Sequence, residues 1–281
     1  MKTIVNRKEG KEVMITDEGP TVLIGEGINP TGRKKVVNAL KEGNWEVIKE
    51  DVTKQVEAGA DVLDVNVSMA DAEEADLLPQ VIKVVMDTVD IPLCIDTSSQ
   101  VALEAALEVY EGRPIVNSVT GEESSLSTVL PLVKKYDAAV IGLAMDEEGI
   151  QNDPEKRAAV ARKIVERAES EGIPPENVII DCLTLTIGTD TRNALITLEA
   201  IKKVKQDLGV NMTLGISNIS FGMPDRELLN SSFLSMAIQS GVTCPIADAG
   251  SAKPVILATD LLLGRDRMAE RYIADYRKRQ K

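Results

Sequence analysis

Polar side chains that could bind a small molecule recur at the ends of short apolar runs in this sequence. They are Glu26, Asn29, Asp64, Asn66, Asp96, Asn117, Asp181, Ser217, Asn218 and Asp248. Asp and Asn are depleted from strands, so their repeated placement beside apolar runs needs a reason. A carboxylate accepts two parallel N–H bonds, and an amide both donates and accepts. The set therefore suits a planar heterocycle that presents adjacent N–H donors and a carbonyl.

Taken singly, each of these residues has a simpler interpretation as a helix cap. Asp and Asn are favoured N-caps, and Asp248 and Glu26 fit this interpretation best. The whole set fits it less well, because burying many carboxylates and amides without partners is costly. Where these residues meet, we therefore expect a small polar molecule, such as one with the amino-oxo edge of a pterin.

The composition narrows the chemistry that these residues can perform. The 281 residues include no histidine. This excludes a Ser-His-Asp triad, a Cys-His pair, a histidine general base and histidine metal ligands within the sequence. The net charge of −13 argues against nucleic-acid binding, because phosphate neutralisation needs clustered Lys and Arg.

The three cysteines predict neither a disulfide framework nor a metal site. Cys94, Cys182 and Cys244 are widely spaced, with no CxxC motif. Small buried hydrophobes in a reducing compartment are the favoured interpretation, and a three-cysteine zinc site is the alternative. The first twenty residues contain no apolar signal core, and no apolar stretch approaches ~18 residues. We expect a cytoplasmic protein that binds no membrane and no metal.

Short runs rich in β-branched residues alternate with charged stretches of helical period. The runs are Thr21–Asn29, Ala60–Val67, Pro92–Thr97, Pro114–Thr120, Ala138–Met145, Val178–Thr186, Met212–Ser220 and Cys244–Ala249. Continuously apolar strands separated by helices are typical of a parallel sheet covered on both faces. Eight such units predict an α/β protein with a single-domain (β/α)8 barrel, residues 21–281, preceded by an N-terminal extension, residues 1–20. A doubly wound sheet is the alternative, but no GxGxxG motif follows the first run.

The barrel would gather the polar residues at one end. Active sites of (β/α)8 barrels lie at the carboxyl ends of the strands. Alternation along a strand would turn Asp64 and Asn66 toward the barrel axis and Leu63 and Val65 toward the helices. The same parity turns Asp96 inward. The helical stretch Leu228–Ile238 is nearly apolar, which favours either core packing or a homodimer.

Six of these segments, taken in order, resemble the pterin-binding methyltransferases that exchange a methyl group between tetrahydrofolate and a corrinoid protein. The segments are Gly25–Asn29, Leu63–Val67, Cys94–Thr97, Val116–Ser118, Ile180–Asp181 and Leu214–Ser220. The stretch Asp225–Leu234 is similar as well, and the resemblance spans about residues 21–265. It implies a (β/α)8 barrel methyltransferase with tetrahydrofolate or 5-methyltetrahydrofolate as substrate. It also implies cobalamin carried by a separate corrinoid protein.

The resemblance further implies roles for individual residues. Asp96, Asn117 and Asp181 would hold the pyrimidine edge of the pterin. Asn218 would lie near N5, the nitrogen that gives or receives the methyl group, and would act in catalysis. The other substrate-binding residues would be Gly215 and Ser217 in the wall and Asp64 and Asn66 in the floor.

Two departures and two alternatives remain open at this stage. Relatives often have Arg in place of Gly27 and a polar residue such as Gln in place of Phe221. The wider superfamily includes dihydropteroate synthase, which typically carries a Ser-Arg-Lys segment after strand seven and a late Arg-x-His. This sequence has Ser217-Asn218-Ile219 there and no histidine. A non-catalytic folate-binding subunit is the other alternative, and the sequence decides neither the direction of transfer nor the upstream methyl donor.

Overall fold

A closed parallel barrel forms the body of the molecule in the computed structural model, which describes residues 1–8, 10–69 and 73–280. Its strands are β3 (Ile24–Ile28), β4 (Val62–Asn66), β5 (Leu93–Asp96), β7 (Ile115–Thr120), β8 (Ala139–Leu143), β9 (Val178–Asp181), β10 (Asn211–Thr213) and β11 (Ile246–Ala247). They form one sheet in the order β10-β9-β8-β7-β5-β4-β3-β11. The Cys244 and Ile246 amides donate to the Met212 and Leu214 carbonyls at 3.1 and 2.9 Å, which joins its two edges. The predicted (β/α)8 barrel is confirmed.

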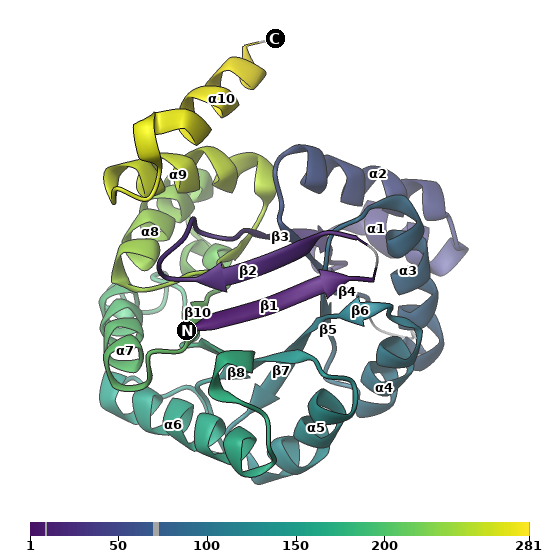
Figure 1. The fold of residues 1–281 in the computed structure, drawn as a ribbon, viewed down its shortest axis with the longest axis horizontal. Coiled ribbons are helices and arrows are strands. Elements are labelled where there is room, and N and C mark those ends of the chain that lie inside the picture. Colours follow the sequence, from purple (N-terminus) through teal and green to yellow (C-terminus); the bar gives the residue numbers. More distant parts are fainter. Residues whose placement is uncertain (9, 70–72, 281) are drawn as a thin grey trace.

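Helices surround the strands (Figure 1). They are α1 (Lys34–Glu42), α2 (Trp45–Glu57), α3 (Glu74–Thr88), α4 (Gln100–Val109), α5 (Glu123–Lys135), α6 (Pro154–Ser170), α7 (Asn193–Leu208), α8 (Arg226–Ser240) and α9 (Ala249–Leu262). The last helix, α10 (Glu270–Arg279), projects away from this ring. Local signals set their ends. The Asp153 side chain caps α6 by accepting a hydrogen bond from the Glu155 amide, and Pro154 is the first residue of this helix. The helix α7 ends at Gly209, which has a left-handed backbone conformation.

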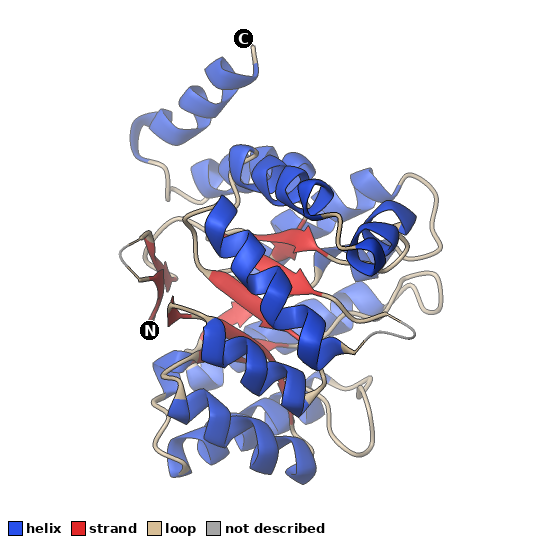
Figure 2. Cartoon of the chain, turned by 90° about the vertical axis from the view of Figure 1, so that its right-hand side faces the viewer, coloured by secondary structure: helices blue, strands red, loops and turns tan. Residues whose placement is uncertain are grey.

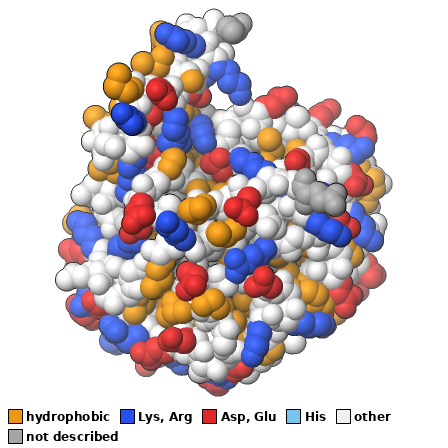
Figure 3. All heavy atoms as spheres, viewed as in Figure 1, with side chains coloured by type: hydrophobic (Ala, Val, Ile, Leu, Met, Phe, Trp, Pro, Cys, Tyr) orange, Lys and Arg blue, Asp and Glu red, His pale blue; other side chains and the backbone are white. Residues whose placement is uncertain are grey.

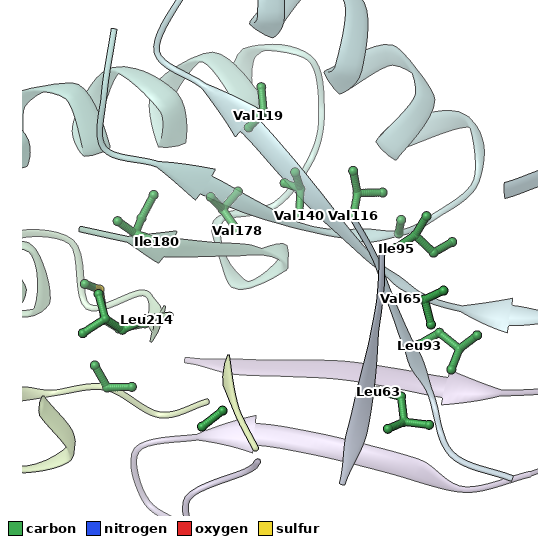
Figure 4. Packing of buried hydrophobic residues seen from close by; sticks show 14 of the residues in the cluster. Leu63, Val65, Leu93, Ile95, Val116, Val119, Val140, Val178, Ile180 and Leu214 are labelled. Carbon is green, nitrogen blue, oxygen red and sulfur yellow. The ribbon is translucent and has the colours of Figure 1, made fainter. Parts of the chain in front are cut away.

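Two layers of apolar side chains pack against the strands. The outer layer lies between strands and helices and contains Leu63, Val65 and Ile95, as predicted from the alternation (Figure 4). The inner layer fills the barrel and includes Cys94 and Ile141. Each strand is therefore buried on both faces. The polar residues singled out in the sequence lie toward the carboxyl ends of the strands, whereas the buried Asn211 begins β10 and donates to Thr3 Oγ1 and the Ile15 carbonyl.

An N-terminal hairpin closes the opposite end of the barrel. It is formed by β1 (Lys2–Arg7) and β2 (Glu12–Thr16), and the short β6 (Gly112–Arg113) pairs with β1. Val5 and Ile15 pack on the inner layer and are fully buried. Figure 2 shows the hairpin on one side of the barrel and the long loops on the other. Access to the interior is therefore from the loop side.

Two of the predicted strands end five and seven residues earlier than expected. The strand predicted over Val178–Thr186 ends at Asp181, where the carboxylate accepts the Leu183 amide at 2.6 Å and turns the chain. The strand predicted over Met212–Ser220 ends at Thr213, and Ile216–Ser220 is a 3₁₀ helix. Side-chain bonds to the local backbone compete with the strand ladder at both places. Within the described ranges, no helix is both long and apolar enough to cross a bilayer.

Candidate functional site

The register of neighbouring strands sets the polar residues of the mouth side by side. Glu26 on β3 lies opposite Asp64 on β4. Asp96 on β5 lies opposite Asn66 on one side and Asn117 of β7 on the other. Because the strands are parallel and their side chains alternate, these groups form one continuous row at the carboxyl ends of the strands.

Two amides link the carboxylates of this row. Asn66 Nδ2 donates to Asp96 Oδ2 at 2.8 Å, and Asn117 Nδ2 donates to Asp64 Oδ1 at 3.3 Å. The Asn66 oxygen in turn accepts the Ser68 amide at 2.8 Å, which holds its side chain in place. Each carboxylate has further lone pairs with which it can accept N–H groups.

Burial makes this row a poor place for negative charge. Burial and then the nearby Asp96 raise the pKa of Asp64 well above its usual range. Burial also raises the pKa of Asp96, where the bond from Asn66 opposes the shift and Glu74 adds to it. A positive group or an N–H donor that approaches either carboxyl therefore stabilises its ionised form.

Asp181 is anchored at the end of β9 by backbone donors and a buried arginine. Burial raises its pKa to about 6, although the amides of Leu183 and Gly215 favour the carboxylate. Arg157 on α6 is fully buried below the turn, and its Nη1 donates to the carbonyls of Cys182 and Leu183 at 3.0 and 2.9 Å. The guanidinium thus holds the segment that carries Asp181.

The 3₁₀ helix after β10 places Ser217 and Asn218 at the rim. Asn218 is exposed, and its amide finds no hydrogen-bond partner among the residues that the structure describes. A Cβ on Gly215 would lie 3.0 Å from Asn218 Nδ2, so glycine is what allows the amide to lie against the backbone. An amide that is both exposed and supported is available to a bound ligand.

Side chains of α8 hold this turn from behind. Arg226 Nη2 donates to the Ser217 carbonyl at 2.9 Å, and Arg226 Nε donates to Ser220 Oγ at 3.0 Å. Ser220 Oγ donates to Asn230 Oδ1 at 2.7 Å. Arg226 and Asn230 belong to the segment Asp225–Leu234, which resembles the methyltransferases. The sequence alone assigned no role to this segment, and in the structure the two side chains position the turn that carries Asn218.

The cap interpretation holds for Asp248 and fails for Glu26. Asp248 is the N-cap of α9 and accepts the Ser251 amide. Glu26 lies within β3, caps no helix, and accepts a bond from Ser217 Oγ at 3.3 Å.

A cavity of about 420 Å³ opens beside Asp96 and Asn117. Its hydroxyl lining consists of Thr97, Ser98, Ser99, Ser118, Thr120, Ser124, Ser125 and Thr128. Such a lining offers donors and acceptors and little charge. Within the described ranges, no cluster of three Cys, Asp or Glu side chains has metal-binding geometry, and all three cysteines are free and buried.

Comparison with known proteins assigns the family. The model of a family described as pterin binding enzyme matches residues 25–248. The chain belongs to this family. This pterin-binding enzyme is 31% identical over 264 residues to the methylcorrinoid:tetrahydrofolate methyltransferase of Eubacterium limosum, with 91% of this chain and 96% of the relative covered.

One further relative and one solved structure also match this chain. The methionine synthase of Mycobacterium leprae is 31% identical over 250 residues, which cover 84% of this enzyme and only 21% of the synthase. The dihydropteroate synthase of Yersinia pestis superposes with a TM-score of 0.71 at 14% identity, covering 92% of this chain and 99% of the synthase. The second likeness concerns the fold alone.

The geometry of this pterin-binding enzyme groups the residues singled out in the sequence. Asp64, Asn66, Asp96 and Asn117 lie in one row, in which Asn66 bonds to Asp96 and Asn117 bonds to Asp64. Asp181 joins Gly215 through a backbone donor, and Ser217 joins Glu26. Ser217 and Asn218 were expected on a strand and lie on a 3₁₀ turn beyond it. Arg157, Arg226 and Asn230 were missed as supports of the site.

Proposed function

We propose that this enzyme transfers a methyl group between N5 of tetrahydrofolate and the cobalt of a corrinoid carried by a separate protein. The observation that carries the proposal is the 31% identity to a methylcorrinoid:tetrahydrofolate methyltransferase, which extends over nearly the full length of both chains. The polar row at the mouth supports it, because acceptors and amides there match the N–H and carbonyl groups of a pterin.

In this proposal the pterin lies across the mouth with its pyrimidine edge toward β5, β7 and β9. The carboxylates of Asp96 and Asp181 accept the N–H groups of that edge, and Asn117 supplies both a donor and an acceptor. Asp64 and Asn66 support this contact from below by holding Asn117 and Asp96. Gly215 and Ser217 form the wall beside the reduced ring.

The reaction requires positioning rather than a protein nucleophile. When methylcorrinoid is consumed, the N5 lone pair forms the new C–N bond, the Co–C bond breaks, and its electron pair stays on cobalt as Co(I). The reverse direction transfers the methyl group to Co(I) and leaves N5 with the C–N electron pair. Asn218 stabilises the charge that develops on N5 in either direction.

We assign the corrinoid to a partner protein that docks over the loop side of the barrel. The described residues form one barrel whose interior is filled with side chains, so the mouth is the place where a cobalt centre can reach N5. Phe221, which follows the 3₁₀ helix that carries Asn218 and is 70% exposed, supplies apolar surface for this contact.

We also propose a homodimer formed through α8, α9 and α10. A groove of about 600 Å³ runs between α8 and α9 and is lined largely by apolar atoms, and Leu262 at its edge is 86% exposed. The helix α10 extends from the barrel (Figure 1), and apolar side chains gather along it (Figure 3). A second copy that places its α10 in this groove would cover the groove and the apolar side chains of α10.

The oligomeric state tests this assembly. Sedimentation analysis should give a dimer for the wild type and a monomer for Leu262→Glu, whereas a wild-type monomer would contradict this assembly.

The methyl transfer is tested with purified protein. The experiment mixes 5-methyltetrahydrofolate with cob(I)alamin and follows methylcobalamin by its absorbance, and then mixes tetrahydrofolate with methylcobalamin. Catalysed transfer supports the proposal, and a chain that binds folate without accelerating either reaction is a binding subunit. Condensation of a pterin pyrophosphate with p-aminobenzoate would instead identify a synthase.

A further inference from the structure

One carboxyl group of the mouth is connected to the Asn218 turn through a single hydroxyl. Glu26 is partly buried in the middle of β3, and its Oε1 accepts a hydrogen bond from Ser217 Oγ at 3.3 Å. Ser217 directly precedes Asn218. The Ser217 hydroxyl therefore links the turn that carries Asn218 to an ionisable oxygen.

A small cavity with both polar and apolar lining residues lies behind this pair, between α8 and α9. Its volume is about 60 Å³, and its polar lining consists of Glu26, Ser217, Asn230, Ser231, Asp248 and Ser251. A cavity of this size with several polar partners can hold water. Water there would connect Glu26 with the solvent without passing through the pterin site.

The charges around Glu26 leave its carboxylate a better base than a free glutamate. Burial raises the pKa of Glu26, and the bond from Ser217 lowers it in part. Asp248 at the start of α9 raises it further, while Arg33 before α1 and Arg226 on α8 oppose this. Asp64 on β4 is the remaining charged neighbour. A pKa moved toward neutrality suits a group that both accepts and returns a proton.

The other buried carboxyls of the mouth are already engaged. Asp64 and Asp96 accept hydrogen bonds from Asn117 and Asn66, and Asp181 accepts from backbone amides. Amide N–H groups hold these carboxylates but cannot relay a proton as a hydroxyl does. Of the described carboxyls, Glu26 is the one that a hydroxyl connects to the Asn218 turn.

We propose that Glu26 exchanges the N5 proton of the folate through the hydroxyl of Ser217, an inference that rests on the proposed methyl transfer. When N5 of tetrahydrofolate attacks the methyl group, the product nitrogen holds one proton too many. That proton passes to Ser217 Oγ while the Ser217 proton passes to Glu26 Oε1. In the reverse direction protonated Glu26 returns a proton by the same route, N5 accepts it, and the C–N bond then breaks.

The test is the pH profile of single-turnover methyl transfer from 5-methyltetrahydrofolate to cob(I)alamin. In this direction Glu26 must be protonated, so the rate is highest below its pKa and falls as pH rises through it. We call this fall in rate with rising pH the limb of the profile. Glu26→Gln should lower the rate by about 10²-fold and remove the limb, while affinity for 5-methyltetrahydrofolate changes little. Ser217→Ala should also lower the rate and remove its fall with rising pH, and Ser217→Thr, which keeps the hydroxyl, should restore both.

A matched variant checks that the limb belongs to Glu26. Asp248→Asn keeps the helix cap and removes the negative neighbour, so it should move the limb to lower pH without abolishing it. Glu26→Gln and Ser217→Ala proteins that bind folate and keep the wild-type rate and profile would overturn the inference and leave the proposed function intact. A wild-type chain that neither binds folate nor methylates cob(I)alamin would overturn both. If Glu26→Gln does not fold, the two Ser217 variants decide.

Discussion

Arg157 and Leu183 meet below the candidate site, where the buried guanidinium of α6 donates to the Leu183 carbonyl at 2.9 Å. The same Nη1 atom donates to the Cys182 carbonyl, and Thr197 of α7 accepts from it at 3.2 Å. Leu183 itself has a positive φ of 59°. A buried cation thus holds a backbone turn in an uncommon conformation, and that turn presents Asp181 to the mouth.

Replacing this cation should cost both stability and ligand affinity. Arg157→Leu removes the hydrogen bonds to the Cys182 and Leu183 carbonyls, of which Leu183 keeps a bond from Thr197 Oγ1 at 3.1 Å, and it lowers the free energy of unfolding by about 1–3 kcal/mol. Urea denaturation and tetrahydrofolate titration measure the two effects. The control is Arg162→Leu on the same helix, where a half-exposed ion pair with Asp207 is worth less than about 1 kcal/mol. Equal losses in both variants would contradict a special role for Arg157.

Removing a carboxylate from the pyrimidine edge should weaken folate binding. Asp96→Ala should cost roughly 1.5–3 kcal/mol, the scale of a hydrogen bond to a charged group, and Asp181→Ala a similar amount. Calorimetric titration with tetrahydrofolate measures this, with the exposed Asp87→Ala as control. If both variants bind folate as the wild type does, the pterin edge lies elsewhere.

Asp181 should give folding and ligand binding opposite pH dependences. Its pKa rises from 3.8 to about 6 on folding, chiefly through burial. Its contribution to the free energy of unfolding is therefore complete below pH 3.8 and is lost as pH rises through about 6. Folate affinity runs the other way, because the ionised carboxylate is the better acceptor of N–H groups.

The measurement for Asp181 compares urea unfolding and folate titration over this pH range in the wild type and Asp181→Asn. The raised pKa values of Asp64 and Asp96 add to the wild-type profile. Only the difference between the two proteins therefore reports on Asp181. A difference that does not vary with pH would show that this carboxyl does not titrate in the range.

The barrel and the row at its mouth could be predicted from the sequence because both follow from periodicity. The alternation along Leu63–Val67 predicts that the Asp64 side chain points toward the barrel axis, and parallel strands bring their carboxyl ends together. The Ser217–Asn218 turn could not be derived in this way. It depends on Arg226, which donates to the Ser217 carbonyl and to Ser220 Oγ, and an apolar run carries no sign of such competition.

Arg157 could have been found by the same periodicity. On α6 it shares the buried stripe of Val160, Ala161, Ile164 and Ala168, at helical spacing. A charged residue on an apolar stripe indicates a buried cation that needs acceptors. The link between Ser217 and Glu26, in contrast, joins the seventh barrel strand to the first, and only the closed barrel reveals it.

Gly215 should matter for turnover through Asn218. Its φ of −73° suits any residue, so Gly215→Ala introduces no backbone strain. The added methyl group would lie 3.0 Å from Asn218 Nδ2 and should displace that amide. We expect kcat to fall about tenfold or more, and the double variant with Asn218→Ala to be no slower than Asn218→Ala alone. Additive losses in this cycle would show that Gly215 acts independently of Asn218.

Asn218→Ala should reduce turnover more than binding. Its exposed amide has no hydrogen-bond partner in the described part of the chain, so its removal disturbs little of the folded state. If the amide stabilises charge on N5 in the transition state, kcat falls by about 10²-fold while KM for the folate changes little. Steady-state kinetics with saturating cob(I)alamin separate these parameters, and Asn152→Ala, on an exposed loop, is the control. A rise in KM with kcat intact would make Asn218 a residue of ground-state binding only.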